Sequence, residues 1–130
     1  MILNRDQILS IADLKTELVE MPEWGGSVYV RGMNGAERDK FEGSLVEQRG
    51  KERKVNTANI RAKLASLTIC DESGKRLFSE ADVQAISQKS ASALQRIFEV
   101  AQRLSGITDA DVEELAEEIE KDPFEGSPTD

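Results

Sequence analysis

The chain has 130 residues, of which 38% are hydrophobic and 32% charged, the size and composition of one ordinary globular domain. It contains no histidine, and so it lacks the commonest general base at neutral pH and the commonest metal ligand. Its one cysteine, Cys70, can form neither an intramolecular disulfide nor a cysteine metal site. No apolar run resembles a signal peptide or approaches the roughly 20 residues of a membrane-spanning helix. We therefore expect a cytoplasmic protein that is not an enzyme and binds no cofactor, metal or membrane.

The formal net charge of −8 belongs to one end of the chain. Residues 1–108 carry sixteen Lys and Arg against fifteen Asp and Glu, whereas residues 109–130 carry ten acidic residues against the single Lys121. A face that binds phosphates needs an excess of basic side chains, and neither part has one. We therefore expect no nucleic-acid partner, which argues against a regulator of transcription.

Residues that favour helix N-caps precede each predicted helix, and an acidic residue three positions later often completes the pattern. The first helix, in which Ile8 and Ile11 lie on one side, is predicted to end within two turns, near Asp13. The predicted caps are Asn4, Asn34 with Glu37, Asn56, Ser79 with Asp82, Ser90 or Ser92, and Thr108 with Asp111.

A β-hairpin is predicted after the first helix. Residues 16–21 and 27–33 contain β-branched and aromatic side chains, and the five residues between them include one proline and two glycines, which is turn chemistry. Trp24 lies in this turn and has two interpretations. It either packs over the core, which we favour, or stands exposed as an anchor for a binding partner.

The spacing of apolar residues sets the extent of the remaining elements. One helix is predicted from Gly35 to about Arg49, and residues 50–54, which have no apolar side chain, are predicted to form a solvated connection. Residues 68–70 and 75–78 are predicted to be short extended pieces around a tight turn. The clearest helical pattern follows Ser90 and ends at Gly106.

The acidic end carries the second candidate for partner binding. Residues 109–122 are predicted to form an acidic helix that ends before Pro123, and residues 123–130 are predicted to be disordered. Apolar residues at helical spacing have no use in a purely solubilising tail, whereas a helix that docks on a partner or on its own body needs them. This stripe consists of Val112, Leu115 and Ile119.

Together these elements predict an α+β fold, predominantly helical, with a small N-terminal antiparallel β-hairpin packed against four or five helices. Residues 1–108 are predicted to form a single globular domain. The predicted core consists of Val28, Val30, Phe41, Leu45, Ile60, Leu64, Leu67, Ile69, Val83, Ile86, Leu94, Ile97, Phe98, Ala101 and Leu104.

Residues 22–39, Pro-Glu-Trp-Gly-Gly-Ser-Val-Tyr-Val-Arg-Gly-Met-Asn-Gly-Ala-Glu-Arg-Asp, resemble the hairpin-to-helix segment of siphophage tail assembly chaperones. The opening Arg5-Asp6-Gln7-Ile8-Leu9 with Asp13-Leu14 is similar to the start of those proteins. The ending, an acidic helix followed by a short tail containing Asp-Pro, is similar as well. Many members of the family are also made as a longer product, by ribosomal frameshifting. The present chain resembles the short form.

The resemblance implies a function in tail assembly. A chaperone of this kind keeps the tape measure protein soluble, brings tail tube subunits to it in the host cytoplasm, and is absent from the finished virion. Coating a long partner also implies a homo-oligomer built by head-to-tail contacts. The alternative is a structural protein of the virion, such as a minor tail or head-tail connector protein. The resemblance implies no catalytic residue.

Overall fold

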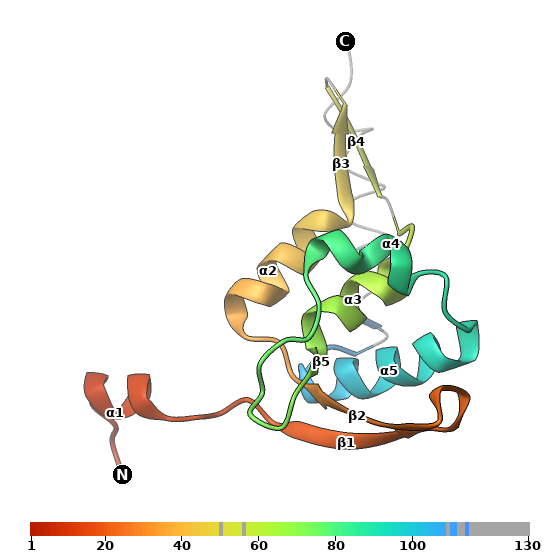
Figure 1. Ribbon diagram of the computed structural model, residues 1–130. Helices are drawn as coiled ribbons and strands as arrows, with labels where there is room; N and C mark the ends of the chain where they lie inside the picture. The colour runs from red at the N-terminus through yellow and green to blue at the C-terminus, as the bar shows by residue number, and fades with distance from the viewer. Residues whose placement is uncertain (50, 56, 109, 112–113, 115–130) are drawn as a thin grey trace.

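The computed structural model describes residues 1–49, 51–55, 57–108, 110–111 and 114. Helices form a layer on one side of a three-stranded antiparallel sheet, so the fold is α+β as predicted (Figure 1). The helices of this part are α1 (Arg5–Ser10), α2 (Gly35–Ser44), α3 (Ile60–Thr68), α4 (Val83–Ile86) and α5 (Ala91–Leu104). Their number agrees with the four or five that were predicted.

The sheet contains the predicted hairpin and one strand more. It consists of β1 (Thr16–Met21), β2 (Gly26–Arg31) and β5 (Ile69–Cys70), in the order β1-β2-β5. Side chains alternate between the two faces of a strand. The face of the sheet that turns toward α5 is buried, and its buried side chains are Val19, Met21, Val30 and Ile69. The sequence predicted an extended piece at residues 68–70, but its pairing with β2 was not predicted.

The turn of the hairpin is the short 3-10 helix η1 (Pro22–Trp24). It begins with proline, whose fixed φ suits the first position of a helical turn, and it ends at Gly25, whose φ of 72° lies in the left-handed region that favours glycine. The predicted turn chemistry is therefore confirmed. As a result, Trp24 is held at the tip of the hairpin.

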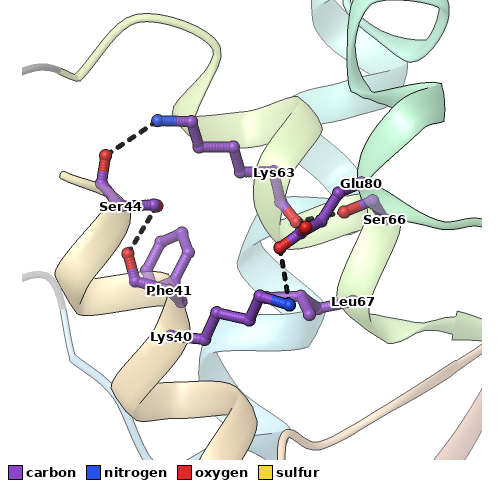
Figure 2. Close-up of a pocket in the computed structure, with 7 residues that line it drawn as sticks. All are labelled: Lys40, Phe41, Ser44, Lys63, Ser66, Leu67 and Glu80. Atoms are coloured by element: carbon purple, nitrogen blue, oxygen red, sulfur yellow. Dashed lines mark hydrogen bonds and ion pairs between the residues drawn. The ribbon is translucent and has the colours of Figure 1, made fainter.

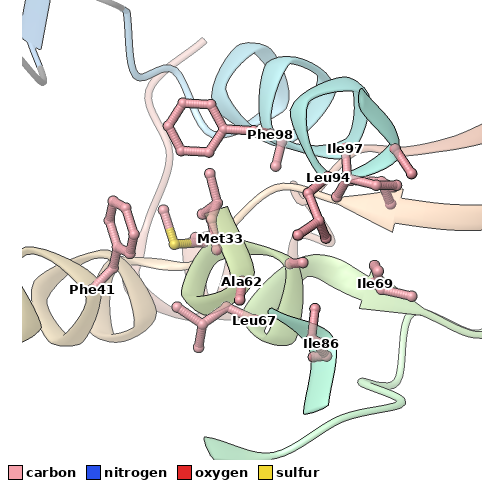
Figure 3. Close-up of a cluster of buried hydrophobic side chains, with 14 of the residues drawn as sticks. Met33, Phe41, Ala62, Leu67, Ile69, Ile86, Leu94, Ile97 and Phe98 are labelled. Atoms are coloured by element: carbon pink, nitrogen blue, oxygen red, sulfur yellow. The ribbon is translucent and has the colours of Figure 1, made fainter. Parts of the chain in front are cut away.

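The hydrophobic core lies between α3, α5 and the sheet (Figure 3). All predicted core residues belong to the buried cluster or pack against it; Val28, Ile60, Val83 and Leu104 are its partly buried members. The prediction missed three alanines of α3 and α5, two residues of β1 and two residues in connecting segments. These are Val19, Met21, Met33, Ala62, Ala65, Ala93 and Ile107.

Two predictions about residues 45–55 are wrong. The helix α2 starts at Gly35 as predicted, with a capping box between Asn34 and Glu37, but it ends at Ser44. The strands β3 (Val46–Arg49) and β4 (Glu52–Val55) follow and form a second hairpin in place of the last helical turn and the solvated connection. Gly43 weakens the end of the helix, and β-branched Val46 and Val55 pair directly across the two strands.

Other helix starts agree more closely with prediction. The capping box of Ser79 and Asp82 opens the 3-10 helix η2 (Glu80–Asp82), which runs into α4, and Ser90 rather than Ser92 caps α5. Helix α3 begins at Ile60, later than predicted, and Asn56 lies outside the described residues. Thr108 and Asp111 form the predicted reciprocal hydrogen bonds at 3.0 Å each.

The first helix, α1, stands apart from the rest of the described structure (Figure 1). The predicted cap at Asn4 is confirmed, and it forms a capping box: Asn4 Oδ1 accepts from the backbone N–H of Gln7 and the Gln7 side chain accepts from the backbone N–H of Asn4, each at 2.9 Å. None of its six residues is buried. An extended stretch, residues 11–15, joins it to β1.

A close contact between backbones fixes the end of β2 against the end of α5. A Cβ atom built on Gly32 would lie 2.5 Å from the carbonyl oxygen of Leu104. The neighbour is backbone, so no side-chain rotation can relieve the overlap. Only glycine therefore allows the chain leaving β2 to approach the helix this closely.

Replacing Gly32 by alanine should lower the free energy of unfolding by about 1–3 kcal/mol, the usual cost of overpacking. Chemical denaturation measures this change. The matched control is Gly35→Ala at the start of α2, where a Cβ meets no atom within 4 Å and the substitution should be neutral or stabilising by up to about 1 kcal/mol. Equal effects of the two substitutions would contradict the close approach at Gly32.

Candidate partner-binding site

An apolar cleft lies between the tip of the β1–β2 hairpin and α4. It has a volume of about 490 Å³, within the range of sites that enclose small ligands or the side chains of a partner. Its apolar wall consists of Trp24, Ile69, Phe78, Ala85 and Ile86, and its charged rim consists of Glu23, Asp82 and Lys89. We call this surface the Trp24 cleft.

Trp24 keeps 36% of its surface exposed and lies outside the buried core cluster. The side chain lies over core residues of β5 and α4, as the favoured interpretation predicted, but it remains partly exposed and forms one wall of the cleft. A large aromatic side chain that is partly exposed beside an apolar cleft is typical of an anchor for a binding partner.

An ion pair between hairpin and α5 holds the turn that carries Trp24. Both guanidinium N–H groups of Arg96 donate to the carboxylate of Glu23, with 2.9 Å between Nη2 and Oε2, and Ser92 Oγ donates to the same carboxylate at 3.2 Å. The hydrogen bonds from Arg96, followed by one from the backbone of the turn, lower the pKa of Glu23 to about 2. The turn is thus fixed against a residue 73 positions away in the chain.

Replacing Arg96 by glutamine should raise the pKa of Glu23 from about 2 toward its ordinary value of about 4.3. NMR titration of the side-chain carboxyl carbons measures both values. The matched control is Arg103→Gln, which removes the partner of Glu17 (2.9 Å) and should leave the titration of Glu23 unchanged. Because folding lowers this pKa, the ion pair stabilises the protein above about pH 4.3 and this stabilisation is lost as the pH falls through about 2. An unchanged Glu23 titration in Arg96→Gln would contradict the pairing.

The other predicted binding residues cannot be placed. Val112, Leu115 and Ile119 lie outside the described residues. The remaining residues of the Trp24 cleft were missed as site residues, because they come from separate segments of the chain. Ile69 and Ile86 were predicted only as core residues, and Asp82 only as part of a helix cap. The hairpin turn was the one local signal for this site.

A second hollow, of about 210 Å³, lies between α2 and α3 (Figure 2). Its charged groups are paired within the chain: Lys40 Nζ lies 2.6 Å from Glu80 Oε2, and Lys63 Nζ donates to the backbone oxygen of Ser44 at 3.0 Å. The hydroxyl of Ser44 donates to a backbone oxygen of its own helix. Each polar group therefore has a structural partner, and the hollow has no pair of groups arranged as a nucleophile and its base.

Cys70 is buried in β5. Burial raises the pKa of its thiol, so the reactive thiolate is disfavoured. In the part of the chain that the structure describes, no group of three or more His, Cys, Asp or Glu side chains is arranged to hold a metal ion. The helices described there are also too short or too polar to cross a membrane.

The fold and this cleft define an α+β protein whose clearest surface feature suits contact with another protein. Residues 5–121 match the family described as phage tail assembly chaperone. The chain therefore belongs to the phage tail assembly chaperone family, as the hairpin-to-helix segment predicted.

A solved structure of the tail assembly chaperone of bacteriophage HK97 has a similar fold, with a TM-score of 0.58. The alignment covers 80% of this chain and 95% of the HK97 chain, at 19% sequence identity. At this identity the likeness supports the fold alone. A search of the curated proteins gives no significant match.

Proposed function

We propose that this chain binds the tape measure protein, keeps it soluble, and helps to recruit tail tube subunits while the tail is assembled. The observation that supports the proposal is membership of the phage tail assembly chaperone family across residues 5–121. The function requires no catalytic group and no cofactor. The protein acts in the host cell cytoplasm and is absent from the mature virion.

The surface of the described part suits binding of apolar partners. Large apolar side chains remain exposed around α1 and in the Trp24 cleft, and exposed apolar surface of this kind marks protein–protein contacts. The acidic residues 109–130 supply repulsion that opposes aggregation while the tape measure protein is coated. Several copies acting together by head-to-tail contacts would cover a long partner.

Co-expression with the tape measure protein of the same genome tests the proposal. The tape measure protein should move from the insoluble to the soluble fraction and co-purify with this chain. A variant that lacks residues 109–130 tests whether the stripe of Val112, Leu115 and Ile119 contributes to binding. A tape measure protein that stays insoluble and unbound in the presence of the full chain would contradict the proposal.

Mass spectrometry of purified virions separates the proposal from its alternative, a minor tail or head-tail connector protein. A chaperone should be missing from particles that contain the tail tube protein. Its presence there at a fixed number of copies would favour the structural protein. Family membership supports the chaperone.

A further inference from the structure

Residues 1–14, which we call the N-terminal arm, present apolar side chains with no cover from the described part of the chain. Ile2 is 96% exposed and Leu9 is 68% exposed. The other large apolar side chains of the arm, Met1, Leu3, Ile8, Ile11 and Leu14, are exposed as well. Such a concentration on one segment is unusual for a monomeric protein and indicates a surface that another surface covers.

Within the part of the chain that the structure describes, the arm makes hydrogen bonds only with itself. The hydrogen bonds of residues 1–14 join members of the arm to one another. The first hydrogen bond to the described body runs from the backbone N–H of Gly32 to the oxygen of Lys15, at 3.0 Å. A helix of six residues is too short to be stable alone in water. The capping box of Asn4 specifies where it begins, and docking of its apolar residues must supply the remaining stability.

The arm and the Trp24 cleft lie at opposite ends of the same hairpin. The arm enters β1 at its first residue, whereas Trp24 follows its last (Figure 1). A strand of six residues spans about 20 Å, and α1 points away from the hairpin tip. Because the arm leaves one end of the hairpin and the cleft lies at the other, the arm is better placed to enter the cleft of a neighbouring copy than its own.

The two surfaces also match in chemistry. The cleft has a volume of about 490 Å³, an apolar wall, and Asp82 and Lys89 at its rim. The arm carries aliphatic side chains between Arg5 and Asp13. The arm includes Arg5 and Asp13 and the rim includes Asp82 and Lys89, so both surfaces carry charges of both signs. Opposite charges at the rim of an interface select orientation more than they add affinity.

We infer that the N-terminal arm of one copy docks its apolar side chains into the Trp24 cleft of a second copy. Each molecule then donates an arm at one end and accepts one at the other, which gives a head-to-tail assembly rather than a closed two-fold dimer. Docking that buries five of the exposed apolar side chains of the arm removes roughly 60–120 Å² of surface for each of them. Because the cleft loses a similar area, the two surfaces together bury about 600–1,200 Å². This area is at the low end of specific interfaces, so association should be reversible and depend on concentration.

This inference rests on the self-association contained in the proposed function, and the protein carries its own reporter of the contact. Trp24 is the single tryptophan and forms a wall of the cleft. Docking of an arm removes water from the indole ring, and its fluorescence emission should shift to shorter wavelength as protein concentration rises. Sedimentation velocity over the same concentrations measures the assembly directly.

Two substitutions remove one surface each. Leu9→Asp places a charge on the arm, which makes no contact needed for folding of the body, and Ala85→Glu fills the cleft from an exposed position on α4. Each should weaken association at least tenfold. The matched control, Leu77→Asp, changes a leucine that is also more than half exposed (54%) but lies outside both surfaces, and it should associate as the parent chain does.

Mixing the two variants gives the sharpest test. Neither should assemble alone, but the intact arm of Ala85→Glu fits the intact cleft of Leu9→Asp, so the mixture should form one-to-one dimers and nothing larger. A parent chain that stays monomeric, or a mixture without dimers, would overturn the inference. So would a Trp24 emission that Leu9→Asp alters in the dilute monomer, because the arm would then occupy its own cleft.

The tape measure protein provides the remaining distinction. Co-expressed Leu9→Asp that still solubilises the tape measure protein but forms no head-to-tail assembly supports the inference and shows that binding of the tape measure protein does not require the assembly. Trp24 emission that shifts only when the tape measure protein is added would assign the cleft to that partner and overturn the inference. Failure of the parent chain to bind the tape measure protein, with assembly unchanged, would contradict the proposed function alone.

Discussion

Replacing Ile97 by alanine should lower the free energy of unfolding by about 2–5 kcal/mol, because the substitution removes buried methyl groups and leaves a cavity. Ile97 has no exposed surface and lies on the side of α5 that faces α3 and the sheet (Figure 3). The total stability of a domain of this size is on the order of 5–15 kcal/mol. The variant should therefore unfold at a much lower denaturant concentration than the parent chain.

Urea denaturation followed by circular dichroism measures this loss. The matched control is Leu77→Ala, which also shortens an aliphatic side chain but at a position that is more than half exposed; its effect should be within about 0.5 kcal/mol. Similar losses for the two variants would show that α5 does not form the centre of the core.

The starts of helices could be predicted from the sequence because their signals are local. Asn34 and Ser79 each form reciprocal hydrogen bonds with the residue three positions later, an interaction that two nearby residues determine by themselves. The core face of α5 was predictable for a similar reason. Its apolar residues repeat with the period of a helix, and the structure buries all but Leu104 of those predicted.

The features that were missed depend on partners that are distant in sequence or on backbone pairing alone. The extended piece at residues 68–70 was predicted, but its place in the sheet was not, because Ile69 and Cys70 pair with Val30 and Tyr29 of the distant β2. The β3–β4 hairpin follows a helix whose apolar residues gave no sign of its early end. Pairing of this kind is set by the backbone and the turn, and residues 50–54 have no apolar pattern to mark it.

The Trp24 cleft shows the same limit at the level of the site. The turn that carries Trp24 was predictable from proline and glycine. The position of this turn in the fold could not be predicted, because it depends on the ion pair between Glu23 and Arg96 on α5. The remaining walls come from β5, α4 and the segments around η2, and only the tertiary fold brings them together.

A buried ion pair joins β2 to α2. Arg31 donates to both carboxylate oxygens of Glu37, at 2.9 and 2.7 Å, and only 8% and 15% of the two side chains is exposed. Burial by itself raises the pKa of Glu37, but the hydrogen bonds from Arg31 and from the backbone of Asn34 outweigh it and hold the pKa below its ordinary value. The same carboxylate thus pairs a buried cation and completes the cap of α2.

Replacing Glu37 by alanine should lower the free energy of unfolding by about 3–5 kcal/mol, since the guanidinium of Arg31 would remain buried without its partner. The matched control is Glu42→Ala on the same helix, which breaks an exposed pair with Arg38 (3.1 Å) and should cost less than about 1 kcal/mol. Replacing both Arg31 and Glu37 by methionine should recover much of the loss, because no buried charge then remains unpaired.

The pH dependence separates loss of this pair from loss of packing alone. Because folding lowers the pKa of Glu37, its contribution to stability is complete above about pH 4.3 and is lost as the pH falls through the lower folded-state value. Denaturation at a series of pH values should therefore show that the difference in free energy of unfolding between the parent chain and Glu37→Ala narrows in acid. A difference that stays constant with pH would mean that the carboxylate acts through packing and not through its charge.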